Sequence, residues 1–158
     1  MDSMKKVLFV SSAGGHLAQL LQFKSLFHNY NYLLVTEYIP SNQDLGELYT
    51  VSFVKKRKGG RGLGFWLDFI SNSVIAFKIM WQHNPDVVVS TGSYIAIPFL
   101  IFSKIFRAKS IFLLSYARVN SRAKSADVAY YLADVFIVQW ESALKNYRRG
   151  VFLDGGIY

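Results

Sequence analysis

The segment that most constrains the fold is residues 5–16, in which an apolar run ends abruptly in small residues and two glycines. Leucines with helical spacing follow it, at Leu17, Leu20 and Leu21, so the pattern predicts a strand, a glycine turn and a helix. At such a helix start, free backbone N–H groups and the helix dipole attract anions. The segment lacks the G-x-G-x-x-G spacing of dinucleotide sites, and we interpret it as a candidate phosphate-binding loop.

Strand and helix patterns alternate along the rest of the chain. Apolar runs predict strands near residues 5–11, 31–37, 50–54, 86–91, 110–115 and 134–138, and helical spacing predicts helices near 16–28, 63–82, 94–106, 122–132 and 141–147. This alternation predicts an α/β protein whose sheet is mostly parallel and flanked by helices. A length of 158 residues is typical of one domain, and we expect residues 1–158 to form it.

A second loop of small residues, Thr91–Gly92–Ser93, follows the predicted strand 86–91 and precedes the predicted helix 94–106. In an open parallel sheet both loops lie at the carboxyl ends of strands, where ligands bind. Two such loops at one edge would hold a phosphate better than either alone. Ordinary turn chemistry also explains the second loop.

His16 is the one histidine, of three, that lies in a candidate anion loop. An imidazole titrates near neutral pH, so His16 could take a proton from a sugar hydroxyl; a structural loop histidine is the other interpretation. The chain has no cysteine and no H-x-x-x-H spacing, so we expect neither a metal site nor a cofactor.

The net charge of +8 is concentrated in two places. One is a basic run made of Lys55, Lys56, Arg57, Lys58 and Arg61. The other is an acid-free stretch, 104–124, that includes Arg118. Such surfaces fit anionic lipid, a phosphorylated substrate or nucleic acid, or are simply solvated. The basic residues match no nucleic-acid recognition module, so we do not expect a nucleic-acid partner.

The predicted helix 63–82 is apolar around most of its circumference, including Phe65 and Trp66. That arc is wider than one side of a sheet covers, so the helix is either wedged among neighbouring elements or contacts a bilayer or a partner. The basic run would then hold it at an anionic membrane surface. No signal peptide is visible and no stretch reaches the roughly 18 apolar residues of a membrane span, so we expect peripheral attachment.

Residues 11–17, 84–98, 111–119 and 136–141 together carry a family resemblance. The chain resembles the acceptor-side subunits of two-component glycosyltransferases of bacterial capsule and exopolysaccharide synthesis. It is also similar to the membrane-anchoring subunit of the eukaryotic transferase that adds the second N-acetylglucosamine to dolichol diphosphate. The resemblance implies the Rossmann-like N-terminal half of a GT-B glycosyltransferase.

The resemblance also implies a divided enzyme at the cytoplasmic face of the cell membrane, inactive without its second subunit. A catalytic partner subunit would carry the UDP-sugar site, and this chain would bind a polyprenyl-diphosphate-linked sugar as acceptor. His16 is the candidate catalytic base in this chain, and a base on the partner subunit is the alternative. The acceptor and its diphosphate would be bound by Ser12, Gly14, Gly15, Thr91, Gly92, Ser93 and Arg118.

Three further positions follow from the resemblance. Trp140 and Glu141 match a family motif whose role the sequence does not reveal. The tail residues Gly155, Gly156, Ile157 and Tyr158 resemble a tail that grips the partner. Family members commonly have a glutamate where this chain has Leu114, so this chain lacks an acidic group at that position. The alternative function is therefore a non-catalytic membrane adaptor, which recruits and activates the catalytic subunit.

Overall fold

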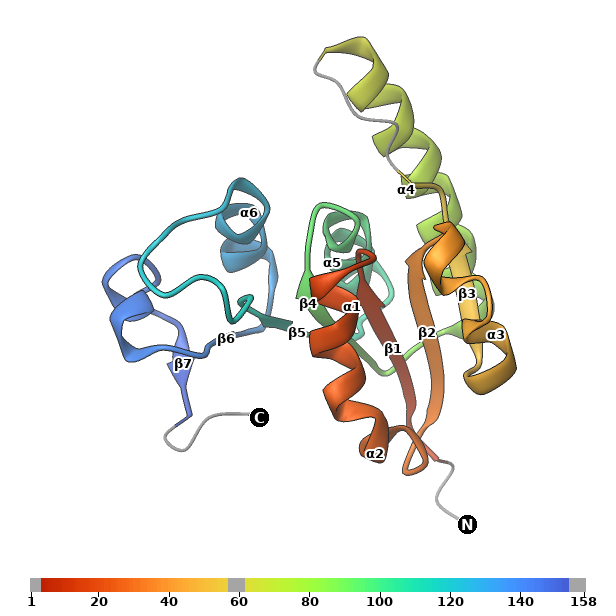
Figure 1. Ribbon diagram of the computed structural model, residues 1–158, viewed down its shortest axis with the longest axis horizontal. Coiled ribbons are helices and arrows are strands. Elements are labelled where there is room, and N and C mark those ends of the chain that lie inside the picture. The colour runs from red at the N-terminus through yellow and green to blue at the C-terminus, as the bar shows by residue number, and fades with distance from the viewer. Residues whose placement is uncertain (1–3, 57–61, 154–158) are drawn as a thin grey trace.

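One parallel sheet runs through the described part of the chain, residues 4–56 and 62–153 of the computed structural model (Figure 1). Its seven strands lie in the order β3-β2-β1-β4-β5-β6-β7. They are β1 (Lys6–Ser11), β2 (Asn31–Glu37), β3 (Val51–Val54), β4 (Val87–Gly92), β5 (Lys109–Leu113), β6 (Val135–Val138) and β7 (Val151–Phe152). The strand order reverses between the neighbours β1 and β4, and open α/β sheets bind ligands beyond the carboxyl ends of strands at such a point.

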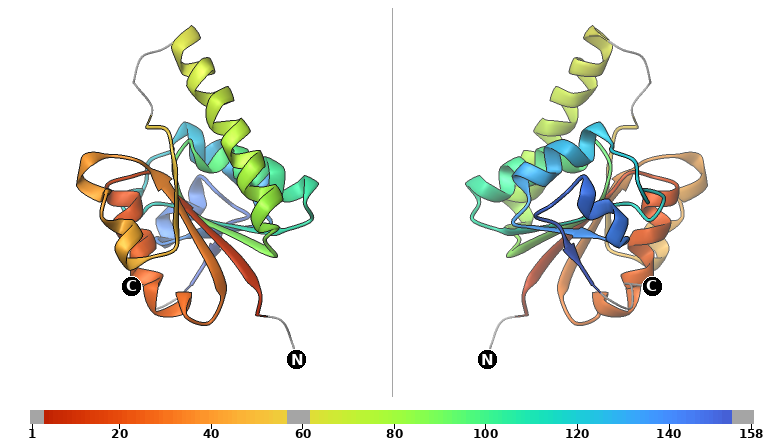
Figure 2. Two further views of the ribbon diagram at one scale, coloured as in Figure 1. Left: turned by 90° about the vertical axis from the view of Figure 1, so that its right-hand side faces the viewer. Right: turned by 90° about the vertical axis from the view of Figure 1, so that its left-hand side faces the viewer.

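Helices cover both faces of the sheet (Figure 2). They are α1 (Gly15–Leu20), α2 (Lys24–Phe27), α3 (Leu45–Leu48), α4 (Leu63–His83), α5 (Ala96–Ile105) and α6 (Lys124–Leu132), with short 3₁₀ helices η1 (Leu21–Phe23), η2 (Pro40–Asn42) and η3 (Glu141–Lys145). The connections from β1 to β2 and from β2 to β3 each lead to the next strand in one direction along the sheet. The connections after β3 lead in the opposite direction. Because parallel crossovers are right-handed, the two groups of helices lie on opposite faces.

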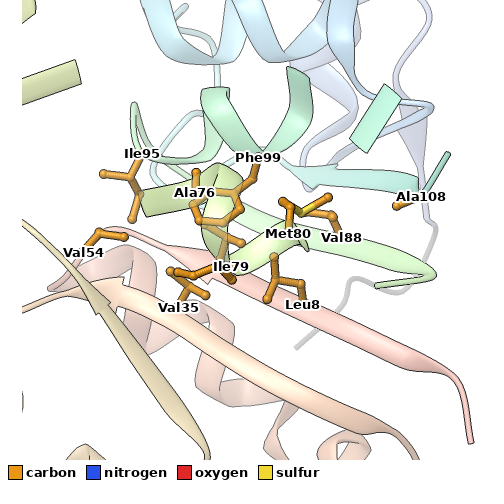
Figure 3. Close-up of a cluster of buried hydrophobic side chains, with 11 residues drawn as sticks. Leu8, Val35, Val54, Ala76, Ile79, Met80, Val88, Ile95, Phe99 and Ala108 are labelled. Carbon is orange, nitrogen blue, oxygen red and sulfur yellow. The ribbon is translucent and has the colours of Figure 1, made fainter. Parts of the chain in front are cut away.

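One part of the core lies between the sheet and the helices α4 and α5 (Figure 3). Leu8 and Val88 point from neighbouring strands toward Ala76 and Met80 of α4 and Phe99 of α5, and each of these residues is at most 1% exposed. Side chains alternate between the two faces of a strand, so the neighbouring strand residues point to the opposite face. This alternation explains the continuous apolar runs of β1 and β4.

The opposite face of the sheet is only partly covered. α1 and α2 pack on β1 and β2, whereas the crossovers after β4 place α5 and α6 on the other face. An apolar groove of about 420 Å³ remains over β4, β5 and β6. Its lining includes Val89, Ile111, Leu113, Ile137 and, near the end of the described chain, Leu153.

The predicted fold class is confirmed, and the six predicted strands match β1 to β6 within two residues at each end. The predicted helix 16–28 is divided into α1, η1 and α2, and the predicted helix at 141–147 is the 3₁₀ helix η3. β7, η2 and α3 were not predicted. They contain only two to four residues each, too few to establish a period of two or of 3.6.

Candidate functional site

The loops after β1 and β4 are bonded to each other at the strand-order reversal. The Ser12 N–H donates to the Gly92 carbonyl at 3.0 Å. The Thr91 hydroxyl donates to the His16 carbonyl at 2.8 Å, and the His16 Nδ1 lies 2.7 Å from the Thr91 carbonyl oxygen. These contacts join residues 75 or more positions apart in the sequence, and they fix loop 12–16 against loop 91–93.

The contact with Thr91 assigns a tautomer to His16. A carbonyl oxygen only accepts hydrogen bonds, so the His16 Nδ1 carries a proton and donates it to Thr91. In the neutral ring the lone pair is then on Nε2. The ring is half-buried and lines a cleft, which allows Nε2 to act as a hydrogen-bond acceptor or a base.

Gly92 is required by two independent features of this contact. Its φ is +105°, a conformation that side chains rarely adopt. A Cβ at this position would lie 2.9 Å from the Cε1 and 3.0 Å from the Nδ1 of His16. Gly14 also has a positive φ, of +80°, but open space surrounds it.

A cleft of about 450 Å³ opens beside these loops. Its lining brings together the predicted site residues His16, Thr91, Gly92, Ser93 and Arg118. The other predicted residues of the first loop do not line it: Ser12 is buried, and Gly14 and Gly15 are exposed at the start of α1. A volume of this size lies within the range of small-molecule sites.

Arg118 gives the cleft a positive charge. It lies in the loop between β5 and α6, where its N–H donates to the Ser115 carbonyl at 2.9 Å and its Nη1 donates to the Ser121 hydroxyl at 3.2 Å. Within the described ranges no salt bridge involves Arg118. Its guanidinium is therefore available to an anion in the cleft.

The Trp140 motif holds the loop that carries Arg118. The Trp140 Nε1 donates to the Tyr116 carbonyl at 2.7 Å, and the two rings lie 4.7 Å apart. Ser142 and Asn146 side chains donate to the carbonyls of residues 119 and 120. Trp140 thus has a structural role that no local pattern reveals, because its partners are more than 20 residues away. Glu141 is exposed in the first turn of η3.

Leu114 follows β5, is 2% exposed and lines the cleft. Its carbonyl accepts a hydrogen bond from the Gln139 Nε2 at 2.7 Å. At this position the cleft wall is therefore apolar, where a glutamate would have supplied a carboxylate.

One acidic residue at the same edge was missed by the sequence reasoning. Glu37 ends β2 and is 8% exposed, and its carboxylate accepts a hydrogen bond from the Ala13 N–H at 3.2 Å. A carboxylate is costly to bury unless it has partners. An acidic residue at the end of a predicted apolar strand, on the edge that bears both loops, was the available signal.

The basic run is only partly within the described residues. Lys55 and Lys56 are exposed just after β3, whereas Arg57, Lys58 and Arg61 lie outside the described ranges. The Lys55 backbone is fixed to α4, because its N–H donates to the Asn72 Oδ1 at 3.1 Å and its carbonyl accepts from the Asn72 Nδ2 at 3.0 Å.

α4 carries a continuous exposed apolar stripe, and its first turns stand clear of the sheet (Figures 1 and 2). Seven side chains on it are at least 43% exposed: Leu63, Trp66, Leu67, Ile70, Val74, Phe77 and Trp81. Of the two residues predicted to contact a membrane, Trp66 is exposed, whereas Phe65 is half-buried and stacks on Phe69. On the opposite side Ala76, Ile79 and Met80 pack into the core.

By length and composition alone, α4 is long and apolar enough to cross a membrane, with 21 residues and a mean hydropathy of 1.3. This corrects the sequence-based expectation that no stretch qualifies, because scattered polar residues interrupt the run without lowering its average enough. The predicted partner-contact residues Gly155, Gly156, Ile157 and Tyr158 lie outside the described ranges.

Solved structures with the same arrangement of strands define the class of fold. MurG of Acinetobacter baumannii has a TM-score of 0.67 and 17% identity, and the match covers 87% of this chain and 42% of that one. A UDP-N-acetylglucosamine 2-epimerase of Rickettsia bellii has a TM-score of 0.70 and 14% identity, over 92% of this chain and 42% of that one. The chain has the Rossmann-like fold of the N-terminal half of GT-B proteins, and it spans less than half the length of these two.

Sequence comparison identifies the family within this class. A family model described as "Oligosaccharide biosynthesis protein Alg14 like" matches residues 42–156, and the chain belongs to that family. Two relatives are each named UDP-N-acetylglucosamine transferase subunit ALG14. The human protein is 21% identical, over 93% of this chain and 81% of its own length. The Yarrowia lipolytica protein is 25% identical, over 96% of this chain and 68% of its own length.

Proposed function

We propose that this chain is the acceptor-binding, membrane-associating subunit of a two-component glycosyltransferase. The complex would transfer a sugar from a UDP-sugar on the partner subunit to a polyprenyl-diphosphate-linked sugar, in the synthesis of an oligosaccharide or polysaccharide. The observation that carries the proposal is the cleft at the β1/β4 reversal, where His16, Ser93 and Arg118 line one cavity. The names of the relatives make UDP-N-acetylglucosamine the first donor to test.

The chemistry of the cleft suits a diphosphate and a sugar hydroxyl. The Arg118 guanidinium can bind phosphate oxygens through two parallel hydrogen bonds, and the Ser93 hydroxyl adds a neutral donor. The acceptor hydroxyl would attack the anomeric carbon of the donor sugar, the bond to UDP would break, and the hydroxyl proton would pass to the His16 Nε2. General-base catalysis of this kind contributes about 10²- to 10⁴-fold in rate.

The names of the relatives support a divided enzyme, because both are called a transferase subunit. We therefore propose that residues 1–158 form one Rossmann-like domain and that a partner polypeptide supplies the nucleotide-sugar site. The proposed surfaces for this partner are the apolar groove over β4 to β6 and, from the family resemblance, the tail residues Gly155 to Tyr158.

The exposed stripe of α4 supports peripheral attachment to the cytoplasmic face of the cell membrane. α4 follows β3 and runs back along the sheet, so its first turns stand at the edge that bears the cleft. Its second half belongs to the core, which favours a helix lying in the membrane surface over one crossing the bilayer. Lys55 and Lys56 lie just before it and would face anionic headgroups. A lipid-linked acceptor would then have its lipid in the membrane and its diphosphate in the cleft.

A reconstituted transfer assay tests the proposal. The reaction would contain a short-chain polyprenyl diphosphate N-acetylglucosamine, a panel of UDP-sugars, and this chain, its partner, or both. We expect transfer only with both subunits. His16→Ala should lower kcat about 100-fold or more, with the exposed His28→Ala as the matched control. Equal transfer by His16→Ala would show that the base lies elsewhere.

Leu114 favours a second candidate function, a non-catalytic membrane adaptor that recruits and activates the catalytic subunit. The apolar wall that this residue forms provides no acid in the cleft. The same assay separates the two functions, because substantial transfer by the partner alone would support the adaptor. Arg118→Ala would then leave the acceptor KM unchanged, as should the exposed control Arg148→Ala.

A further inference from the structure

Glu37 lies where three strands end at the cleft edge of the sheet. It is the last residue of β2, and β2 pairs with β1 so that Thr36 lies beside Ser11. The residue is 8% exposed. A carboxylate in such a place loses most of its hydration, so hydrogen bonds from the protein have to replace it.

The two oxygens of this carboxylate reach two different loops. Oε2 accepts from the Ala13 N–H in loop 12–16 at 3.2 Å. Oε1 accepts from the Tyr94 hydroxyl at 2.8 Å, and Tyr94 follows loop 91–93 directly. Both partners are donors, as suits a carboxylate that only accepts, and hydrogen bonds to an ionised group are stronger than those between neutral groups.

The backbone of Glu37 is itself fixed. Its carbonyl accepts a hydrogen bond from the Asn42 Nδ2 at 2.8 Å. The Asn42 Oδ1 in turn accepts from the Ile39 N–H at 2.9 Å. The turn after β2 therefore fixes the backbone of Glu37. Its carboxylate can then restrain the two loops, because it does not move with them.

We propose that Glu37 is a positioning residue that sets the separation of the two loops and thereby the place of His16 and Ser93 in the cleft. The bonds between His16 and Thr91 join the loops on the cleft side, and Glu37 joins them from the β2 side. Two separate links restrain the loops more than one, which reduces the cost of ordering them when a ligand binds. Its effect on acceptor binding rests on the proposed function.

Amide hydrogen exchange of the full chain tests the link without any ligand. The informative variants are Glu37→Ala, Glu37→Gln and Tyr94→Phe, with the exposed Glu47→Ala as the control for loss of a carboxylate. In Glu37→Ala the amides of residues 12–16 should exchange about tenfold faster or more. Glu37→Gln should stay near wild type, because its amide can accept from Ala13 and donate to the Tyr94 oxygen.

Tyr94→Phe provides the sharper result and keeps the test decisive if Glu37→Ala does not fold. It removes only the hydroxyl of the residue that follows loop 91–93, yet through Glu37 it should speed exchange in residues 12–16 at least threefold. The proposal is overturned if the exchange rates of residues 12–16 in Tyr94→Phe stay within twofold of the wild-type rates. It is also overturned by a Glu37→Gln variant that exchanges as fast as Glu37→Ala.

Kinetics with the partner subunit separate positioning from general stability. With the polyprenyl diphosphate N-acetylglucosamine probe, Tyr94→Phe should raise the acceptor KM about fivefold or more and leave the KM for the UDP-sugar unchanged. Equal rises in both KM values would overturn the positioning role. If the wild-type complex transfers no sugar, the proposed function fails, and the exchange result alone decides whether Glu37 links the loops.

Discussion

Replacing Gly92 by alanine tests the contact on which the candidate site is built. The substitution introduces two costs, a side chain at φ +105° and a Cβ that lies 2.9 Å from the His16 ring. Two other glycines separate these costs. Gly14 has φ +80° with open space around it, and Gly15 has open space and no positive φ.

The expected losses of stability form a series. Gly15→Ala should be neutral or stabilise by up to about 1 kcal/mol, because alanine has less backbone freedom to lose on folding. Gly14→Ala should destabilise by about 1–3 kcal/mol, because φ +80° with ψ −137° is a backbone conformation used almost only by glycine. Gly92→Ala has the same kind of backbone cost, and it also displaces the His16 ring and breaks the 2.7 Å bond from His16 to Thr91. The lost bond adds about 1 kcal/mol or more, so the total loss of stability should be about 2–4 kcal/mol.

Urea unfolding and thermal melting of the three variants measure the series. For a chain of 158 residues, about 2–4 kcal/mol corresponds to a fall in Tm of roughly 5–15 °C. The chemical shifts of the His16 imidazole in an NMR spectrum at fixed pH should also change in Gly92→Ala and stay the same in Gly14→Ala. If Gly92→Ala costs no more than Gly14→Ala, the ring does not pack against residue 92 and the geometry described for the site is wrong.

Three further outcomes are expected. Ile70→Ser on α4 should weaken binding to anionic vesicles about tenfold in flotation assays, whereas Tyr131→Ser, on α6 and 74% exposed, should not. Burial, the largest influence, raises the pKa of the Asp134 carboxyl, but hydrogen bonds from Lys104 and Ser110 outweigh it and lower the pKa to about 2 from 3.8. The stability that this carboxylate contributes is present above pH 4 and is lost as the pH falls toward 2. In urea unfolding, Asp134→Asn should therefore be less stable than wild type at pH 7, and the two proteins should be about equally stable near pH 2. Trp140→Phe keeps the ring but removes the bond to the Tyr116 carbonyl, so trypsin should cut after Arg118 several-fold faster than in the control Trp81→Phe.

Local pattern in the sequence was sufficient for the strands β1 to β6, for the helices α4, α5 and α6, and for the position of the two loops. The apolar runs of β1 and β4 and the small residues after them were recognisable because strand period, turn residues and helix spacing are properties of neighbouring residues. The same reasoning predicted a parallel sheet from the alternation of strands and helices, and the fold class is confirmed.

The site itself depends on contacts that local pattern does not encode. The strand order places β1 beside β4, and only that brings Thr91 to His16, 75 positions away in the sequence. The Ala13 and Tyr94 bonds of Glu37 likewise require β2 to end at the same edge. The sequence alone determined the longer strands and helices and the two candidate loops. Only the tertiary structure decided which of their side chains meet, because those contacts follow from the strand order. It also decided which part of the sheet is uncovered, because the right-handed crossovers leave one half of one sheet face without helices.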